Sequence, residues 1–170
     1  DVQVVELKAD EIHAEMEHGA VDDASEFTTF TSLTQTKRGS RVIIFHNGDI
    51  YRYHFNVVAK QEFIRNNPGK VRKVLHALVR AEDYVRENPA AAQKIVADFS
   101  GIEIDIVRSI WSDANFAVTL DQSLILALED ESRWAIDRGL TGARKVPNYL
   151  DFMYFDGLKS VKPEAVRILR

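Results

Sequence analysis

The chain has 170 residues, of which 45% are hydrophobic and 28% are charged, as in an ordinary globular protein of one domain or one large lobe. Its 22 basic and 26 acidic residues give a formal net charge of −4, which provides no cationic field for binding nucleic acid. The lack of cysteine excludes disulfides, thiolate zinc sites, iron–sulfur clusters and cysteine nucleophiles.

Short strand-like stretches dominate the first third of the chain. Apolar and polar residues alternate over 2–7, residues 41–46 are mostly apolar, and residues 24–30 and 51–59 are rich in β-forming residues. A short helix over 10–18, with Ile12 and Met16 on one face, separates the first two and is expected to end at Gly19. The opening run has no methionine before it, which indicates a processed product or a fragment.

Helices are predicted for most of the chain after residue 60. The apolar period there approaches 3.6 residues, and the clearest helix begins at Pro68 and ends near Pro89. Further helices are expected over 90–99, 104–111 and 121–139, the last of them capped by Asp121, with short turns at 148–152 and 162–164. Strands followed by helices predict an α/β lobe with a helical layer.

Two clusters have the composition of a small-ligand site. In the first, Phe27 and Phe30 flank the hydroxyls of Thr28 and Thr29, and in the second Arg52, Tyr53 and His54 follow one another. Rings and hydroxyl donors line many small-ligand pockets, and Arg52 would supply a charge for an anionic ligand. A half-buried strand with alternating rings is the other interpretation of either cluster.

Signals for metal binding and catalysis are weak. His13 and Glu17 lie four residues apart on the predicted first helix, but a metal site needs three or four convergent ligands, so we expect no metal. Only eight glycines are present, and neither a phosphate-binding glycine loop nor a Gly-x-Ser-x-Gly motif occurs. We therefore expect neither an enzyme nor a cofactor.

Two stretches resemble the solute-binding proteins of ABC importers, in the branch that serves nitrate, taurine, aliphatic sulfonates and thiamine-pyrimidine precursors. One is the strand-like run 4–7 with its helix, continued by His18-Gly19-Ala20-Val21-Asp22. The other is 55–75, with Asn67-Pro68 and the Val-x-x-x-Leu of 71–75, continued by 87–92 and the stop at 99–101. The similarity spans nearly the whole chain, and no single motif in it is diagnostic.

The resemblance implies a type 2 periplasmic-binding-protein lobe with a helical C-terminal portion. Residues 1–55 would form the later part of the second α/β lobe, and residues 56–170 would return into the first, mainly helical. The protein would be periplasmic or extracellular, with a missing N-terminus as its membrane anchor. Its partners would be a small solute and a membrane permease, and an exposed lobe face would favour a homodimer.

The resemblance also assigns the two clusters to the solute cleft. The family commonly has an aromatic-acid-Pro-Tyr turn where this chain has Phe27, Thr28, Thr29 and Phe30, so the rings are kept and the acid and proline are lost. The return strand of the family borders the cleft, which gives Arg52, Tyr53 and His54 a binding role. Strand alternation places Arg52 and His54 on one face and Tyr53 on the other.

Two alternatives from other classes stay open. The chain could be the ligand-sensing domain of a regulator, which a DNA-binding segment elsewhere in the gene would indicate. It could also be an enzyme on the same fold, similar to the thiamine-pyrimidine synthases. Those enzymes carry a cysteine-rich motif, and this chain has no cysteine, so we favour binding without catalysis.

Overall fold

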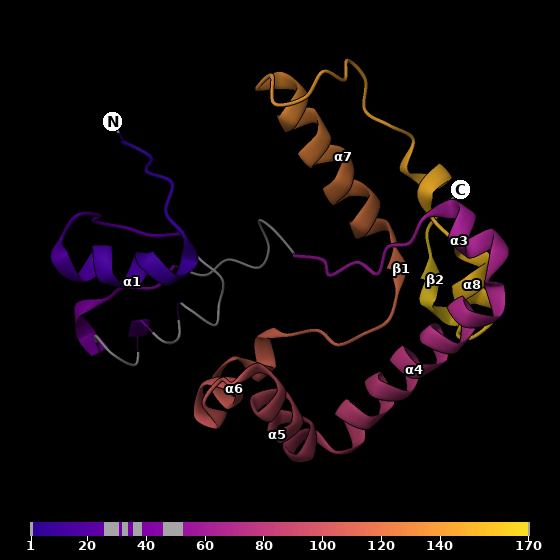
Figure 1. Ribbon diagram of the computed structural model, residues 1–170, viewed down its shortest axis with the longest axis horizontal. Coiled ribbons are helices and arrows are strands. Elements are labelled where there is room, and N and C mark those ends of the chain that lie inside the picture. Colours follow the sequence, from indigo (N-terminus) through magenta and orange to yellow (C-terminus); the bar gives the residue numbers. More distant parts are fainter. Residues whose placement is uncertain (1, 26–30, 32–33, 36–38, 46–52, 170) are drawn as a thin grey trace. The chain divides into compact units, whose positions relative to one another are not determined.

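The computed structural model describes residues 2–25, 31, 34–35, 39–45 and 53–169 (Figure 1). Within these ranges the chain is mainly helical, with a pair of two-residue strands. The elements in chain order are α1 (Ala9–His18), η1 (Gly39–Arg41), α3 (Gln61–Asn66), α4 (Pro68–Glu87), α5 (Pro89–Ser100), α6 (Ile104–Ile110), η2 (Trp111–Asp113), β1 (Leu120–Asp121), α7 (Gln122–Asp137), η3 (Tyr149–Phe152), α8 (Phe155–Lys159), η4 (Pro163–Ala165) and β2 (Val166–Arg167).

The chain divides into two compact units, each built from two separate segments. Unit 1 comprises Asp1–His46 and Pro89–Asn115, and unit 2 comprises Asn47–Asn88 and Phe116–Arg170. The predicted lobes are a different division of the chain, since residues 1–55 and 56–170 are expected to belong to separate lobes of a two-lobed protein. The boundary between these lobes stays a prediction.

Unit 1 contains α1 and the packed pair α5 and α6. The predicted end of α1 is confirmed, because Gly19 has a φ of 72° and the N–H of Ala20 donates to the carbonyl of Glu15 at 2.9 Å. Glycine adopts this left-handed conformation without a Cβ clash. Ala92, Ala97 and Val107 are the buried residues of α5 and α6. Such small side chains bury little apolar area, so they stabilise this pair only modestly.

Unit 2 contains the larger core and the sheet. Its buried apolar side chains come from α7, α8 and η4, and they are Leu124, Ile125, Phe155, Leu158 and Ala165. At Gly157 an added Cβ would lie 2.6 Å from the Tyr154 ring and 3.2 Å from Leu75, so glycine allows α8 to pack closely on α4. β1 and β2 are parallel, with Leu120 opposite Val166 and Asp121 opposite Arg167.

A partly buried ion pair joins the segments of unit 2. The Nζ of Lys162 donates to the two carboxylate oxygens of Glu82 at 2.6 and 2.7 Å, and the N–H of Val118 donates to the same carboxylate at 3.2 Å. The side chains of Glu82 and Lys162 are only 14% and 19% exposed. By contrast, the Lys94–Asp98 pair of α5 is largely exposed. Burial reduces solvent screening, so the Glu82–Lys162 pair matters more for stability.

The helix predictions are confirmed, whereas the strand predictions for the first third are wrong wherever those segments are described. Residues 2–8, 42–45 and 53–60 have no regular secondary structure, and neither do residues 24 and 25. A helix satisfies its own backbone hydrogen bonds, but a strand requires a neighbouring strand. None of these stretches is paired with a strand from the described part of the chain. Residues 26–30, 46 and 51–52 lie outside the described residues.

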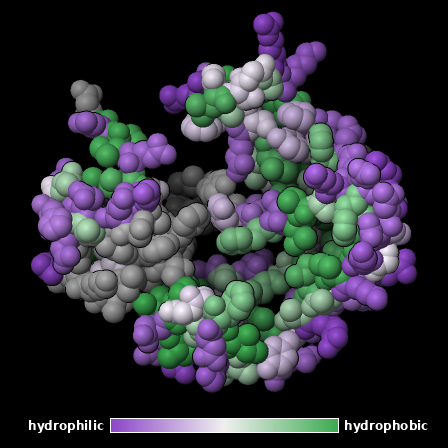
Figure 2. Space-filling model, in the orientation of Figure 1, coloured by the Kyte–Doolittle hydropathy of each residue, from purple (hydrophilic) through white to green (hydrophobic). Residues whose placement is uncertain are grey.

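These irregular stretches leave large apolar side chains at the surface. Figure 2 shows hydrophobic residues lying among the hydrophilic ones on the visible face. Phe45 and Phe55 are each 90% exposed, and Val57 and Val58 of the same stretch as Phe55 are also exposed. The apolar pattern that predicted strands is therefore present, but in the described residues it buries little area.

We predict that Glu82→Gln lowers the free energy of unfolding by about 2 to 3 kcal/mol, because it leaves the Lys162 charge partly buried without a counter-charge. Asp98→Asn, in the exposed pair, serves as the control and should change stability by at most about 0.5 kcal/mol. Urea denaturation followed by the helical circular-dichroism signal measures both. Equal effects of the two substitutions would contradict the account, whereas Glu82→Met with Lys162→Met should recover most of the loss.

Candidate functional site

The candidate site lies in unit 2, where His54 meets the beginning of α7. The Nε2 atom of His54 is 3.1 Å from the hydroxyl oxygen of Ser123, and both side chains are half-buried. The two residues are 69 positions apart in the sequence. This hydrogen bond therefore attaches the irregular stretch 53–60 to the helix.

Asp121 organises the other side of this cluster. It is the last residue of β1 and the N-cap of α7, and its Oδ1 accepts from the Ser123 N–H at 3.1 Å and from the Ser123 hydroxyl at 2.6 Å. Its Oδ2 accepts from the Thr119 hydroxyl at 3.4 Å. Aspartate is a preferred N-cap because it satisfies N–H groups that the first helical turn leaves without partners. The capping role predicted for Asp121 is confirmed.

These hydrogen bonds favour the ionised form of Asp121. The hydroxyl of Ser123 makes the largest contribution to lowering the pKa below the ordinary value of 3.8, and burial acts in the opposite direction. The backbone N–H groups of Leu124 and Ser123 and the hydroxyl of Thr119 lower the pKa further. The site thus contains a carboxylate whose two oxygens are both engaged.

Two of the six predicted site residues lie in the described chain. His54 joins the cluster, while the exposed Tyr53 contacts Phe55 edge to face, with ring centroids 5.0 Å apart. Tyr53 and Phe55 thus share one side of the stretch and His54 turns to Ser123, as strand-like alternation requires. Phe27, Thr28, Thr29 and Arg52 lie outside the described residues, and their assignment to a binding site stays a prediction.

Sequence reasoning missed the partners of His54. Asp121 was expected only as a helix cap, and neither Ser123 nor Thr119 was expected at a site. The Asp-x-Ser spacing at 121–123 signals a capped helix, but it carries no information about a histidine far away in the sequence. Contacts over such a separation follow from tertiary packing.

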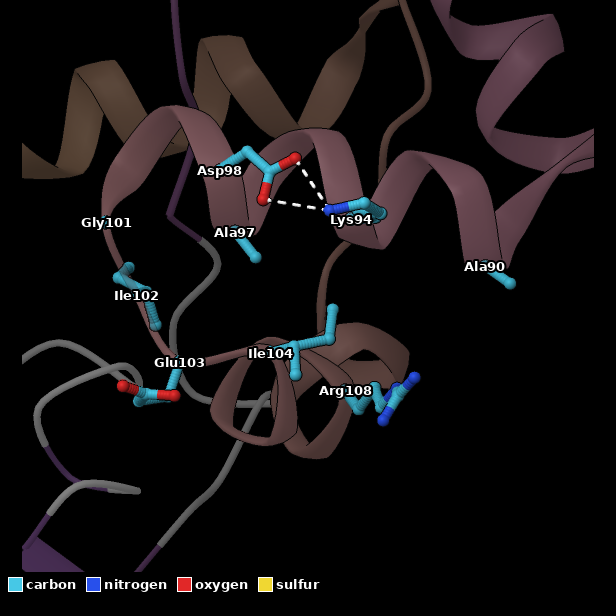
Figure 3. A pocket seen from close by; sticks show the side chains of 9 residues that line it. All are labelled: Ala90, Lys94, Ala97, Asp98, Gly101, Ile102, Glu103, Ile104 and Arg108. Carbon is cyan, nitrogen blue, oxygen red and sulfur yellow. Dashed lines mark hydrogen bonds and ion pairs between the residues drawn. The ribbon is translucent and has the colours of Figure 1, made fainter.

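A hollow in unit 1 is a weaker candidate. It lies between α5 and α6, has a volume of about 460 Å³ and includes Lys94, Asp98, Glu103 and Arg108 in its lining. Lys94 is paired with Asp98, as Figure 3 shows, and Arg108 is paired with Asp105. Glu103 and Arg108 lie apart on opposite sides of Ile104 (Figure 3). Both cations are already neutralised and the charged groups do not converge, so the hollow does not define a ligand.

The described ranges hold neither a cluster of metal ligands nor a membrane-spanning helix. They contain no group of three or more histidine, cysteine, aspartate or glutamate side chains able to hold a metal ion. None of the helices in those ranges combines the length and the hydrophobicity needed to cross a membrane.

We predict that Asp121→Ala lowers the free energy of unfolding by about 1 kcal/mol through loss of the cap, and that Asp121→Asn, which keeps an acceptor oxygen, costs about half as much. Because the pKa of Asp121 is lowered in the folded state, its charge stabilises the fold above the ordinary value of 3.8. That contribution is lost as the pH falls through the folded-state pKa.

Urea denaturation of the unmodified protein and of Asp121→Asn, from about pH 7 to about pH 3, measures this dependence. The stability difference between the two should shrink in acid. A difference that stays constant or grows on acidification would show that the Asp121 charge does not stabilise the fold.

Comparison with known proteins places the chain in a family. A family model described as NMT1/THI5 like matches residues 1–92, more than half of the chain. A Bacillus subtilis (strain 168) protein named "Putative aliphatic sulfonates-binding protein" is 26% identical over 113 residues, which cover 65% of this chain and 33% of that protein. The chain thus matches about a third of that relative's length. No solved structure matches the chain.

The family match confirms the resemblance predicted from the sequence. NMT1/THI5-like proteins have the type 2 periplasmic-binding-protein fold, so the predicted fold class is confirmed at that level. The detailed arrangement of the lobe stays a prediction, because the described elements are mainly helices. The chain belongs to the NMT1/THI5-like family.

Proposed function

We propose that the chain is part of the solute-binding component of an ABC importer. The observation that carries this proposal is the family match over residues 1–92. The Bacillus subtilis relative, whose printed name refers to aliphatic sulfonates, supports a solute-binding role. The chain covers only 33% of that relative, so the relative's name does not identify the solute of this protein. The name is used to choose the solutes that the experiments test.

The proposed solute is small and carries a compact polar head, such as a sulfonate, a nitrate ion or a pyrimidine-like ring. It would bind in a cleft between two lobes, to which residues 1–55 and 56–170 contribute. In this proposal Phe27 stacks on the solute, Thr28 and Thr29 donate hydrogen bonds, and Arg52 or His54 meets the polar head. Tyr53 also borders the proposed cleft, but its side chain would lie on the face opposite to those of Arg52 and His54.

The proposed protein binds and delivers its solute without chemical change. Family membership supports this role, because the NMT1/THI5-like family is a family of binding proteins. The protein would act in the periplasm or outside the cell, held by an N-terminal anchor. The loaded form would dock on a membrane permease, after cleft closure around the solute.

We predict that Phe27→Ala combined with His54→Ala weakens solute affinity by at least about tenfold, because the pair removes a stacking surface and a polar contact. Isothermal titration calorimetry of the full protein with an alkanesulfonate, nitrate and a methylated aminopyrimidine measures the affinity. His76→Ala is the matched histidine control, since His76 is exposed on α4. Unchanged affinity in the double variant would refute the site, and no binding of any probe would refute these solute classes.

We also propose that the apolar stretch 53–59 mediates a homodimer. The stretch contains no Asp, Glu, Lys or Arg, and Phe55, Val57 and Val58 are exposed. Two copies can therefore lie antiparallel without like charges facing each other.

Phe55→Ser with Val57→Ser should weaken self-association at least about tenfold, as measured by sedimentation equilibrium. Phe99→Ser removes an equally exposed ring from unit 1 and is the control. A monomeric unmodified protein, or equal weakening by both variants, would contradict a dimer through 53–59.

A further inference from the structure

The hydroxyl of Ser123 has one proton and two neighbours at hydrogen-bond distance. Oδ1 of Asp121 is 2.6 Å away, and Nε2 of His54 is 3.1 Å away. An ionised carboxylate only accepts, and 2.6 Å is typical of a hydroxyl donating to a carboxylate. The proton of Ser123 therefore points to Asp121.

This assignment determines what His54 must do. Once Ser123 donates to Asp121, its oxygen is available to His54 only as an acceptor. Nε2 must then carry a hydrogen, and 3.1 Å is an ordinary distance for an N–H donating to oxygen. The reverse arrangement, with Ser123 donating to His54, would leave two oxygens 2.6 Å apart without a proton between them.

We propose that Asp121, acting through Ser123, is a positioning residue that holds neutral His54 in the Nε2–H form. A hydrogen bond at one imidazole nitrogen determines which nitrogen carries the proton. The other atoms around Asp121 strengthen this arrangement, since Thr119 and the first N–H groups of α7 keep the carboxylate in place. In the described chain the Nδ1 atom of His54 has no hydrogen-bond partner.

The tautomer of His54 also restricts the kind of solute that the proposed site would bind. This restriction, unlike the tautomer itself, rests on the proposed function. Neutral His54 in this form presents Nδ1 as an acceptor, so it favours a solute that offers an N–H or O–H group. A bare sulfonate or nitrate head accepts only, and it gains a hydrogen bond from Nδ1 only when the ring is protonated. The tautomer of the solute-free protein follows from Asp121 and Ser123 alone, so it can be measured without any solute.

Two-bond ¹H–¹⁵N correlation spectra of the ¹⁵N-labelled protein test the assignment, with His54→Gln used to identify the His54 signals. On the alkaline plateau, where imidazole is neutral, we expect the Nε2–H pattern. In Asp121→Ala the freed hydroxyl can turn and donate to Nε2, so the two ¹⁵N shifts should move toward the Nδ1–H pattern. Asp121→Asn keeps an acceptor oxygen and should restore the original pattern, which a merely structural role of Asp121 does not require.

Two results would overturn the proposal. One is an Nδ1–H pattern in the unmodified protein, and the other is a folded Asp121→Ala variant whose His54 shifts equal those of the unmodified protein. If Asp121→Ala does not fold, the pattern of the unmodified protein and a Ser123→Ala, Ser123→Thr pair decide. Threonine keeps the hydroxyl and should preserve an exchange-protected Nε2–H signal that alanine loses. Solute affinity, measured separately, bears on the proposed function alone.

Discussion

The carboxylate of Glu82 holds together the segments from which the sheet of unit 2 is built. It accepts from Lys162, four residues before β2, and from the N–H of Val118, two residues before β1. The strands that follow place Asp121 at the start of α7, and Ser123 then reaches His54. A partly buried charge on α4 thus supports the position of a histidine on a different segment.

The helices could be predicted from the sequence because a helix satisfies its backbone hydrogen bonds within one segment. Pro68 at the start of α4, Gly19 after α1 and Asp121 before α7 are local signals, and each was found where it was expected. The apolar run 41–46 was predicted as a strand with equal reason. Strand formation depends on a partner segment, and the described chain provides none for that run.

The site could be predicted only in part. His54 was identified by its place within the β-rich run 51–59, which the family resemblance sets beside the cleft, but its link to Ser123 depends on how two segments 69 residues apart pack together. No local pattern encodes that separation. The link also refines the chemistry, because a histidine that shares a hydroxyl with a carboxylate no longer offers both ring nitrogens to a ligand. The four remaining predicted residues belong to a ligand hypothesis that the family match makes worth testing.

Family membership and a relative with a sulfonate-binding name support the central proposal, which is that the protein binds a small solute reversibly. Native mass spectrometry tests it most directly, since one spectrum of the gently purified protein reports chain mass, oligomeric state and any bound small molecule. The account predicts a saturable adduct of one small solute per chain, either co-purified or acquired from a mixture of alkanesulfonates, nitrate and pyrimidines. A folded protein that acquires no adduct from that mixture would contradict the claim.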